Sequence, residues 1–505
     1  MNRTTVVSRI PLLGHIRGWI NIPILLIMLM TATLSACGGN ASNAGNGELS
    51  IALTDAEGDF VSYSVDVVSL SLTRANGTVV QALPVKTRVD FAQYTDMTEF
   101  LTIATIPSGV YVKGELVLDY SSAEILVENA AGIAVAVDRD NIKDNDGNPV
   151  NLMSMSVKLE GKTHLTILPG IPAHLTLDFD LKASNLVSFA AEIPSIQVKP
   201  VLVAEVNLER NRPHRVRGPL KEVQLDAGKF QVYIRPFTHL ISASQPHFGV
   251  LNVHTNDETV FEIDGQTYQG NTGLEILANM DRFSAVAVLG DVKHLPRRFN
   301  AKLVYAGSSV PGGSLDVTRG SVVARSGDVL TVKGITFQRN NGALNFNDTV
   351  SVRLEESTTV LKALKLGTFS KNDISVGQFV TIFGTLSTGE SGEHQLSAAN
   401  GYARMEISSL VANRVGLVHI PEDPPAYDFV LDVKRINGRD IAQYDFSGTG
   451  IDTANDAKAD FYEVDNGPLD VTGIVSEAPV RVRGHVTAFG TAPADFQAMT
   501  VISLP

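Results

Sequence analysis

The chain has 505 residues, a formal net charge of −13 at pH 7 and a single cysteine, Cys37. This length is too great for one hydrophobic core, so several domains are expected. The acidic balance excludes a nucleic-acid partner that needs a basic patch, and one cysteine excludes an internal disulfide and a cysteine-ligated metal site.

The first segment in chain order reads as an export signal. Residues 1–18 carry three arginines and no acid, and the apolar run that follows has a core shorter than the ~20 residues that span a bilayer. The run ends in Leu34-Ser35-Ala36-Cys37, which resembles the lipobox of bacterial lipoproteins. In those proteins the cysteine takes a diacylglyceryl group and becomes the first residue after cleavage. The alternative is an ordinary signal peptide with a chance cysteine.

We therefore expect a lipoprotein signal peptide over residues 1–36 and a lipid-anchored flexible tether over residues 37–47, which are rich in Gly, Asn, Ala and Ser. The expected partner is the membrane, through lipidated Cys37, since two acyl chains give a stable anchor. In such lipoproteins an aspartate after the cysteine favours the inner membrane. Gly38 stands there instead, so the outer membrane is predicted. Loss of residues 1–36 lowers the net charge from −13 to −16, which argues further against nucleic acid.

Beyond the tether, apolar and polar residues alternate with a period of two, as in "SVDVVSLSLTRANG" and "VYVKGELVLDY". Turn dipeptides such as Asn76-Gly77 and Asp264-Gly265 separate these runs. Such runs and turns predict antiparallel strands, and the chain is expected to be all-β.

The first predicted domain covers residues 48–209. Its segments "GELSIALTDA", "IPSGVYVKGELVLD", "HLTLDFDL" and "IQVKPVLVAEV" follow one another in an order and spacing that resemble the bacterial lipoprotein family of domain of unknown function 4382. The resemblance implies a prealbumin-like β-sandwich. That family has no assigned activity, so the resemblance implies no catalytic residue.

Three repeats are expected after the sandwich, over residues 216–308, 316–410 and 411–505. They open alike, at Arg217-Gly218, Arg319-Gly320 and Arg414-Val415-Gly416, and each has a late strand with a glycine in its middle: Gly290, Gly384 and Gly484. Such a glycine permits the bulge that a closing barrel needs. We predict three small OB-like β-barrels in tandem, which resemble the repeated modules of domain of unknown function 5666. The basic, proline-broken segment 208–216 is the expected hinge before them.

Few residues point to chemistry. The chain lacks the G-x-S-x-G and H-E-x-x-H motifs and a complete phosphate-binding loop. One acidic segment could hold Ca²⁺ by ligand density, although Ile142 breaks the EF-hand spacing, and a solvated hairpin with an Asp-Gly turn is the alternative. Its carboxylates are Asp138, Asp140, Asp144 and Asp146.

Two further groups of side chains stand out by spacing alone. His164 and His174 form a close pair on neighbouring predicted strands, for which surface or strand-edge positions are favoured over a metal site. Asp452, Asp456 and Asp460 have the spacing of one face of a short helix, and charged stripes of this kind are usually solvated.

Two functional hypotheses remain. The first is a lipid-anchored cell-envelope protein, a non-enzymatic binding or scaffold module whose ligand is an envelope protein or polymer. The alternative is an extracytoplasmic hydrolase that acts on polysaccharide or peptide through a carboxylate pair. The sequence names no residues for such a pair, because their separation is a property of the fold. No cofactor other than Ca²⁺ is expected.

Overall fold

The structure, a computed structural model, is almost entirely β, which confirms the predicted fold class. From Asn46 onward the chain forms one compact unit. No helix in the described part of the chain is long and apolar enough to cross a bilayer. The structure describes residues 45–54, 60–94, 97–129, 134–159, 164–190, 193–206, 213–235, 248–294, 297–311, 315–337, 344–390, 392–417, 429–469 and 479–503.

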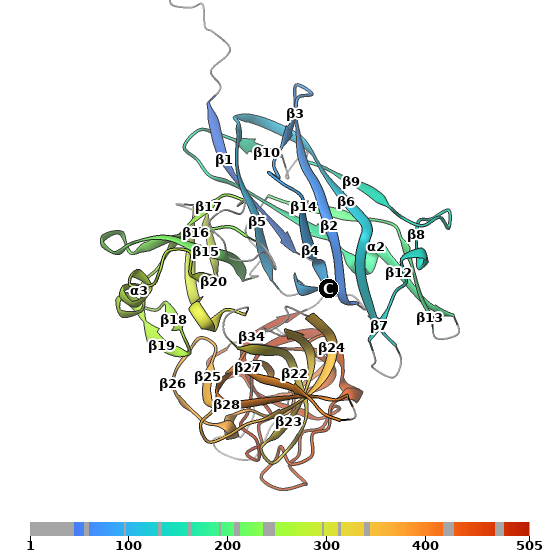
Figure 1. Ribbon diagram of the computed structural model, residues 1–505. Helices are drawn as coiled ribbons and strands as arrows, with labels where there is room; N and C mark the ends of the chain where they lie inside the picture. The colour runs from blue at the N-terminus through green and yellow to red at the C-terminus, as the bar shows by residue number, and fades with distance from the viewer. Residues whose placement is uncertain are drawn as a thin grey trace, which may run out of the picture. The chain divides into compact units, whose positions relative to one another are not determined.

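The N-terminal module is a β-sandwich (Figure 1). In its first sheet, β1 lies between a parallel and an antiparallel neighbour. The strand order of this sheet is β14 (Leu202–Glu205), β11 (Ala173–Phe179), β1 (Asn46–Thr54) and β5 (Thr98–Pro107).

The second sheet is built around two long antiparallel strands, β2 (Phe60–Arg74) and β6 (Gly109–Glu128). Their alternating side chains give the buried face that packs against the first sheet. Shorter strands complete this sheet: β3 (Val79–Gln81), β4 (Thr87–Asp90), β7 (Ala134–Ala136), β9 (Leu152–Lys158) and β10 (Leu165–Ile167). A third, small sheet contains β8 (Ile142–Lys143), β12 (Asn185–Ala190) and β13 (Ile193–Val198).

Three closed five-stranded barrels follow, as the repeats predict. In each, the first strand pairs with the second and the fourth, and the third strand pairs in parallel with the fifth. This pairing closes the ring and leaves no free edge among the five strands, an arrangement of the OB type.

The strands of each ring follow one another along the chain, with the short added elements between them. In chain order, the first barrel has β15 (His214–Gln224), β16 (Lys229–Tyr233), β17 (Val250–His254), β20 (Ala285–His294) and β21 (Arg297–Ala306). The second has β22 (Asp316–Ser326), β23 (Val329–Phe337), β24 (Leu344–Arg353), β27 (Phe379–Thr388) and β28 (His394–Met405). The third has β29 (Ser408–Leu417), β30 (Phe429–Ile436), β32 (Tyr462–Asp465), β33 (Val480–Val486) and β34 (Phe496–Ser503).

Short elements decorate the rings and the sandwich. The added strands are β18 (Val260–Ile263), β19 (Gln266–Gln269), β25 (Thr359–Lys362), β26 (Lys365–Phe369) and β31 (Arg439–Asp440). The helices are α2 (Leu181–Ser184) and α3 (Gly270–Ala278), and the 3₁₀ turns are η2 (Phe91–Tyr94), η3 (Arg139–Asn141), η5 (Leu225–Ala227), η6 (Gly307–Ser309), η7 (Lys371–Asp373) and η8 (Ile441–Gln443).

The mid-strand glycines lie where the fourth and fifth strands change register, as the sequence predicts. The shifts fall at Leu289/Gly290, Phe383/Thr385 and Arg483/Gly484. A Cβ at these glycines would stand 2.0–2.2 Å from a carbonyl oxygen of the fifth strand, which no side chain tolerates. The glycine is therefore required by the bulge that closes each barrel.

The opening of the third repeat is corrected by the strand register. Gly218 pairs with Val286 and Gly320 with Val380, and the residue that pairs with the equivalent Val480 is Ala412, not Gly416. Gly416 therefore lies four residues after Ala412, the true structural equivalent of Gly218 and Gly320, so the similarity of Arg414-Val415-Gly416 to the other openings does not mark equivalent positions. The two earlier openings are equivalent, as expected.

The sandwich and the first barrel share one sheet and one core. His214 and Arg215 of β15 pair with Thr98 and Glu99 of β5, so the hinge expected over residues 208–216 is wrong at its described end. Residues 207–212 lie outside the described part. The domain boundaries themselves stay predictions.

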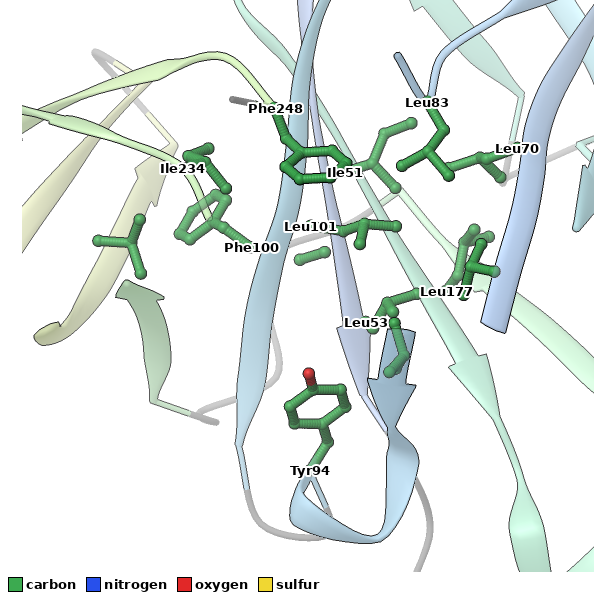
Figure 2. Close-up of a cluster of buried hydrophobic side chains, with 14 of the residues drawn as sticks. Ile51, Leu53, Leu70, Leu83, Tyr94, Phe100, Leu101, Leu177, Ile234 and Phe248 are labelled. Carbon is green, nitrogen blue, oxygen red and sulfur yellow. The ribbon is translucent and has the colours of Figure 1, made fainter. Parts of the chain in front are cut away.

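Apolar contacts reinforce this junction. Figure 2 shows Ile234, which follows β16, and Phe248, which precedes β17, beside Phe100, Leu101 and Ile51 of the sandwich. The carbonyl of Phe248 accepts hydrogen bonds from the Ile103 amide and the Thr102 hydroxyl of β5, at 2.7 and 2.9 Å. The two modules are therefore joined by backbone and side chains alike.

Candidate functional site

The predicted lipidation site lies outside the described residues. This applies to Cys37 and to the lipobox residues Leu34, Ser35 and Ala36. Lipidation therefore stays a prediction of the sequence.

The four acidic residues of the predicted calcium loop lie in and beside a hairpin turn. Asp144 Oδ1 accepts hydrogen bonds from the backbone amides of Asp146 and Asn148, both at 2.9 Å. These amides, Asn148 first, lower the pKa of Asp144. Asp138 and Asp140 lie at η3 before the turn.

This geometry supplies the solvated hairpin that the sequence left as the alternative. Throughout the residues that the structure describes, no three His, Cys, Asp or Glu side chains are grouped as metal ligands. Calcium binding at these four aspartates stays a prediction, which a calcium titration can test.

The acidic segment of the third barrel is a succession of turns, not a helix. Asp452 Oδ1 accepts hydrogen bonds from the amides of Ala454 and Asn455, and Asp456 Oδ1 accepts from Gly450. The carboxylates of Asp452 and Asp456 thus accept hydrogen bonds from nearby backbone amides, and such bonds compete with helix formation. The expected helix face over Asp452, Asp456 and Asp460 is therefore wrong.

The buried histidine contact involves a different pair from the one the sequence suggests. The rings of His174 and His214 lie 5.6 Å apart, and both flank Phe100. His174 Nδ1 is 2.8 Å from Ser50 Oγ, and its Nε2 is 3.0 Å from Thr176 Oγ1. Both ring nitrogens of His174 are thus engaged within the sandwich, whereas His164 is exposed.

A buried ionic cluster closes the junction between the sandwich and the first barrel. Glu99 of β5, 1 % exposed, accepts hydrogen bonds from Arg215 Nε and Arg217 Nε of β15, the latter at 2.8 Å. Burial lowers the pKa of Arg215, with the charge of Arg217 adding to it. Burial also acts to lower the pKa of Arg217, but the negative charge of Glu99 opposes it and the pKa is raised.

A second buried cluster joins the first and second barrels. Arg404 of β28 donates from Nη2 and Nε to the two carboxylate oxygens of Glu262 on β18, at 2.5 and 2.7 Å. Its guanidinium lies 3.8 Å from the ring centre of Tyr305 and donates to the carbonyl of Ser309 at 2.7 Å. Burial alone would lower the pKa of Arg404, and the charge of Glu262 overrides it and raises the pKa.

The two clusters are linked electrostatically through Arg319 of β22. Burial lowers the pKa of Arg319 to about 10, and the positive charges of Arg215 and Arg217 contribute to the decrease. The guanidinium of Arg319 lies 4.8 Å from the ring centre of Phe379. Arg319 therefore lies within the electrostatic reach of both junctions, and its charged form is disfavoured there by burial and by Arg215 and Arg217.

A small polar cavity lies beside β32 and β33. Apolar walls come from Val376, Ala457, Val486 and Ala492, and the polar lining comes from Ser375, Thr449, Tyr462, Thr487 and Asp495. Within the described part of the chain, four buried atoms of this lining have no hydrogen-bond partner: Ser375 Oγ, Tyr462 OH, Thr487 Oγ1 and Asp495 Oδ1.

Asp495 supplies the carboxyl group of this cavity. Its Oδ2 accepts a hydrogen bond from the Glu463 amide at 2.9 Å, and the residue is 4 % exposed. Burial raises its pKa to about 7, and the Glu463 amide opposes that increase. The cavity leaves about 10 Å³ for the centre of a water molecule, so it fits about one water and no sugar or peptide.

The sequence alone does not reveal the clusters or the cavity. Glu99, Glu262, Arg404 and Asp495 stand in ordinary strand patterns, and their partners are remote in sequence. Arg217 and Arg319 mark the openings of two repeats, and this repetition is the one signal that points to them.

Comparison with known proteins supports the predicted family resemblance of the first module. A family described as "Domain of unknown function (DUF4382)" matches residues 46–200, which covers most of the sandwich. No curated protein matches the chain. A solved structure of a proposed cell adhesion protein from Parabacteroides distasonis aligns with 72 % of this chain and 99 % of its own, at 10 % identity and a TM-score of 0.15. Similarity at that level carries no argument about function.

Proposed function

We propose that the protein is a lipid-anchored component of the bacterial cell envelope, and that its modules form a non-enzymatic scaffold or binding platform. The proposal rests on the observation that the buried charged groups form ion pairs between modules. Glu99, Glu262 and Arg404 are engaged across module junctions, where they fix one module on the next. A chain of OB-like barrels attached to a sandwich offers loops and barrel faces to a partner, and barrels of this type commonly bind polymers.

The anchor is supported by the sequence Leu34-Ser35-Ala36-Cys37, and its test is direct. The full-length protein and a Cys37→Ala variant are produced in a Gram-negative host, with Asn40→Ala as the matched control. The unsubstituted protein and Asn40→Ala are expected in the outer-membrane fraction, with an N-terminal peptide whose mass is increased by the lipid. Cys37→Ala is expected to show neither. Release of the unsubstituted protein in soluble form would contradict the anchor.

The scaffold proposal predicts binding without turnover. Purified peptidoglycan is a suitable probe, because it is an envelope polymer that sediments. Co-sedimentation of the protein without release of soluble fragments supports a non-enzymatic role. Release of fragments would favour the hydrolase instead.

One observation is relevant to the hydrolase alternative. A carboxyl group with a pKa near 7 is typical of a general acid, and Asp495 has such a pKa. Its cavity, however, fits only about one water molecule, so a substrate cannot reach the carboxyl in this conformation. This geometry favours the scaffold.

A further inference from the structure

The end of the sandwich at which β1 begins carries a group of exposed aliphatic side chains. We define the apolar end as Val79, Val110, Leu168 and Ile171. They are 58 %, 41 %, 46 % and 54 % exposed, respectively. Single exposed aliphatic residues are ordinary, whereas several gathered at one end of a module mark an interaction surface.

Backbone contacts place these residues together. Leu168 and Ile171 form a bridge at the tip of the turn after β10, and Thr166 of β10 pairs with Val110. The Ala75 amide donates to the carbonyl of Val110 at 2.9 Å. This contact brings in the turn between β2 and β3, and Val79, the first residue of β3, pairs with Thr73 beside that turn.

The start of the described chain lies at the same end. Asn46 pairs with Pro107, and Gly47 is packed so closely on the turn after β10 that a Cβ would stand 2.6 Å from the Leu168 carbonyl oxygen. Cys37 precedes Asn46 by nine positions. At most ~3.6 Å per residue, the intervening chain reaches roughly 30 Å, so an anchor at Cys37 holds this end of the sandwich close to the bilayer.

The charges of this end suit a lipid surface. The segments that form it, residues 45–47, 74–79, 107–110 and 168–171, contain Arg74 and no acidic residue, in a chain with 54 acids. Arg74 Nη2 donates to the Ser108 carbonyl at 2.6 Å, which keeps the cation at the same end. The next acid along the chain is Glu48, within β1. Glu48 is exposed and directly follows Gly47, so this end carries one cation and an acid at its border. Aliphatic side chains beside a cation favour contact with a phospholipid surface.

We propose that the apolar end docks on the phospholipid bilayer surface, with Leu168 and Ile171 entering the interface. The proposal rests on the lipid anchor of the proposed function. Docking would orient the sandwich on the membrane, whereas a lipid on a flexible tether alone would leave its orientation free.

Tryptophan fluorescence tests the proposal, because the single tryptophan, Trp19, lies in the predicted signal peptide. Full-length Leu168→Trp is purified in its lipidated form and placed in vesicles of phosphatidylethanolamine and phosphatidylglycerol, with and without brominated lipid. Ile171→Trp is the second reporter, should the first fail to fold.

Leu186→Trp is the matched control. Leu186 is an aliphatic residue of the same sandwich, 65 % exposed, on β12. Its neighbour Asn185 accepts a hydrogen bond from Tyr63 near the start of β2, whereas Arg74 ends that strand. At about 3.3 Å per residue, roughly 35 Å of strand separates the two positions.

The expected result is a blue-shifted emission that brominated lipid quenches for Leu168→Trp, and neither effect for Leu186→Trp. Equal quenching of both reporters, or none at position 168 in protein whose lipidated Cys37 is confirmed by mass, would overturn the docking and leave the anchor standing. If the mass shows no lipid, the anchor fails, and the released protein is added to the same vesicles. Selective quenching at position 168 then still supports docking, and its absence overturns it.

Discussion

Arg404 and Glu262 form a two-point ion pair across 142 positions of sequence, with side chains only 3 % and 5 % exposed. The pair holds β28 of the second barrel on β18 of the first. Desolvation of both charges offsets much of their attraction, so the pair contributes more to the specificity of the junction than to net stability. Removal of one partner is a different matter, because it leaves a buried charge without compensation.

We predict that Arg404→Leu lowers the free energy of unfolding by about 3–5 kcal/mol, the usual cost of an orphaned buried charge. The double variant Arg404→Leu/Glu262→Leu is expected to recover part of that loss, since the buried Glu262 carboxylate is then absent. Glu406, which also pairs with Arg404 at 3.5 Å, keeps its hydrogen bonds from the Thr381 and Tyr305 hydroxyls. Urea unfolding of the two variants measures both values.

The matched control is the exposed pair of Lys302 and Asp291, 2.8 Å apart with side chains 58 % and 34 % exposed. Lys302→Leu is expected to change stability by about 0–1 kcal/mol. A loss as small as this for Arg404→Leu would show that the buried pair is solvated in solution.

A second prediction concerns Glu99, which faces Arg215 and Arg217 at the other junction. Glu99→Gln keeps the shape and removes the charge, so two buried guanidinium groups lose their counter-ion. We expect a loss of about 3–5 kcal/mol and earlier proteolysis between the sandwich and the first barrel. Limited proteolysis with sequencing of the fragments checks the location. Cleavage within the third barrel instead would contradict a local role for Glu99.

The sequence predicts the barrels well because their signal is local and repeated. Alternation of apolar and polar residues predicts strands. A glycine in the middle of the fourth strand predicts a bulge, which occurs at Gly290, Gly384 and Gly484.

A third prediction follows from these glycines. Gly484→Ala would place a Cβ 2.0 Å from the Gln497 carbonyl oxygen, so the backbone of β33 or β34 must move. We expect a loss of about 1–3 kcal/mol, as for other overpacked sites. Gly114→Ala on β6 is the control, because its Cβ would meet nothing closer than Val157 at 3.4 Å. Equal effects of the two substitutions, measured by thermal unfolding, would show that the bulge has no special need of glycine.

The junctions and the candidate sites could not be predicted in the same way. Burial of Glu99 or Arg404 depends on partners that are remote in sequence, and no pattern near either residue indicates it. The regular spacing of Asp452, Asp456 and Asp460 suggests a helix. Each of the first two carboxylates instead binds a backbone amide within a few residues, and such local competition is invisible to a periodicity argument.

The fourth prediction uses the cavity beside Asp495, where burial raises the pKa to about 7 from an ordinary value of 3.8. The folded protein therefore holds this proton more tightly than the unfolded chain does. The resulting stabilisation is fully present below pH 3.8 and is lost as the pH rises to about 7, where the buried carboxyl ionises. At ~1.4 kcal/mol per pH unit, the loss is at most about 4 kcal/mol.

Asp495→Asn removes this titration and retains an oxygen that can accept the hydrogen bond from the Glu463 amide. We expect the stability of the variant relative to the unsubstituted protein to rise between pH 5 and 7 and to level off above pH 7, in urea unfolding at fixed salt. His485, whose pKa burial lowers to about 4, is present in both proteins, so its own contribution cancels in the difference. Asp460→Asn, at an exposed acid of the same barrel, is the control. A constant difference between Asp495→Asn and the unsubstituted protein across this range would show that the carboxyl titrates as it does in water, and that the cavity is open to solvent.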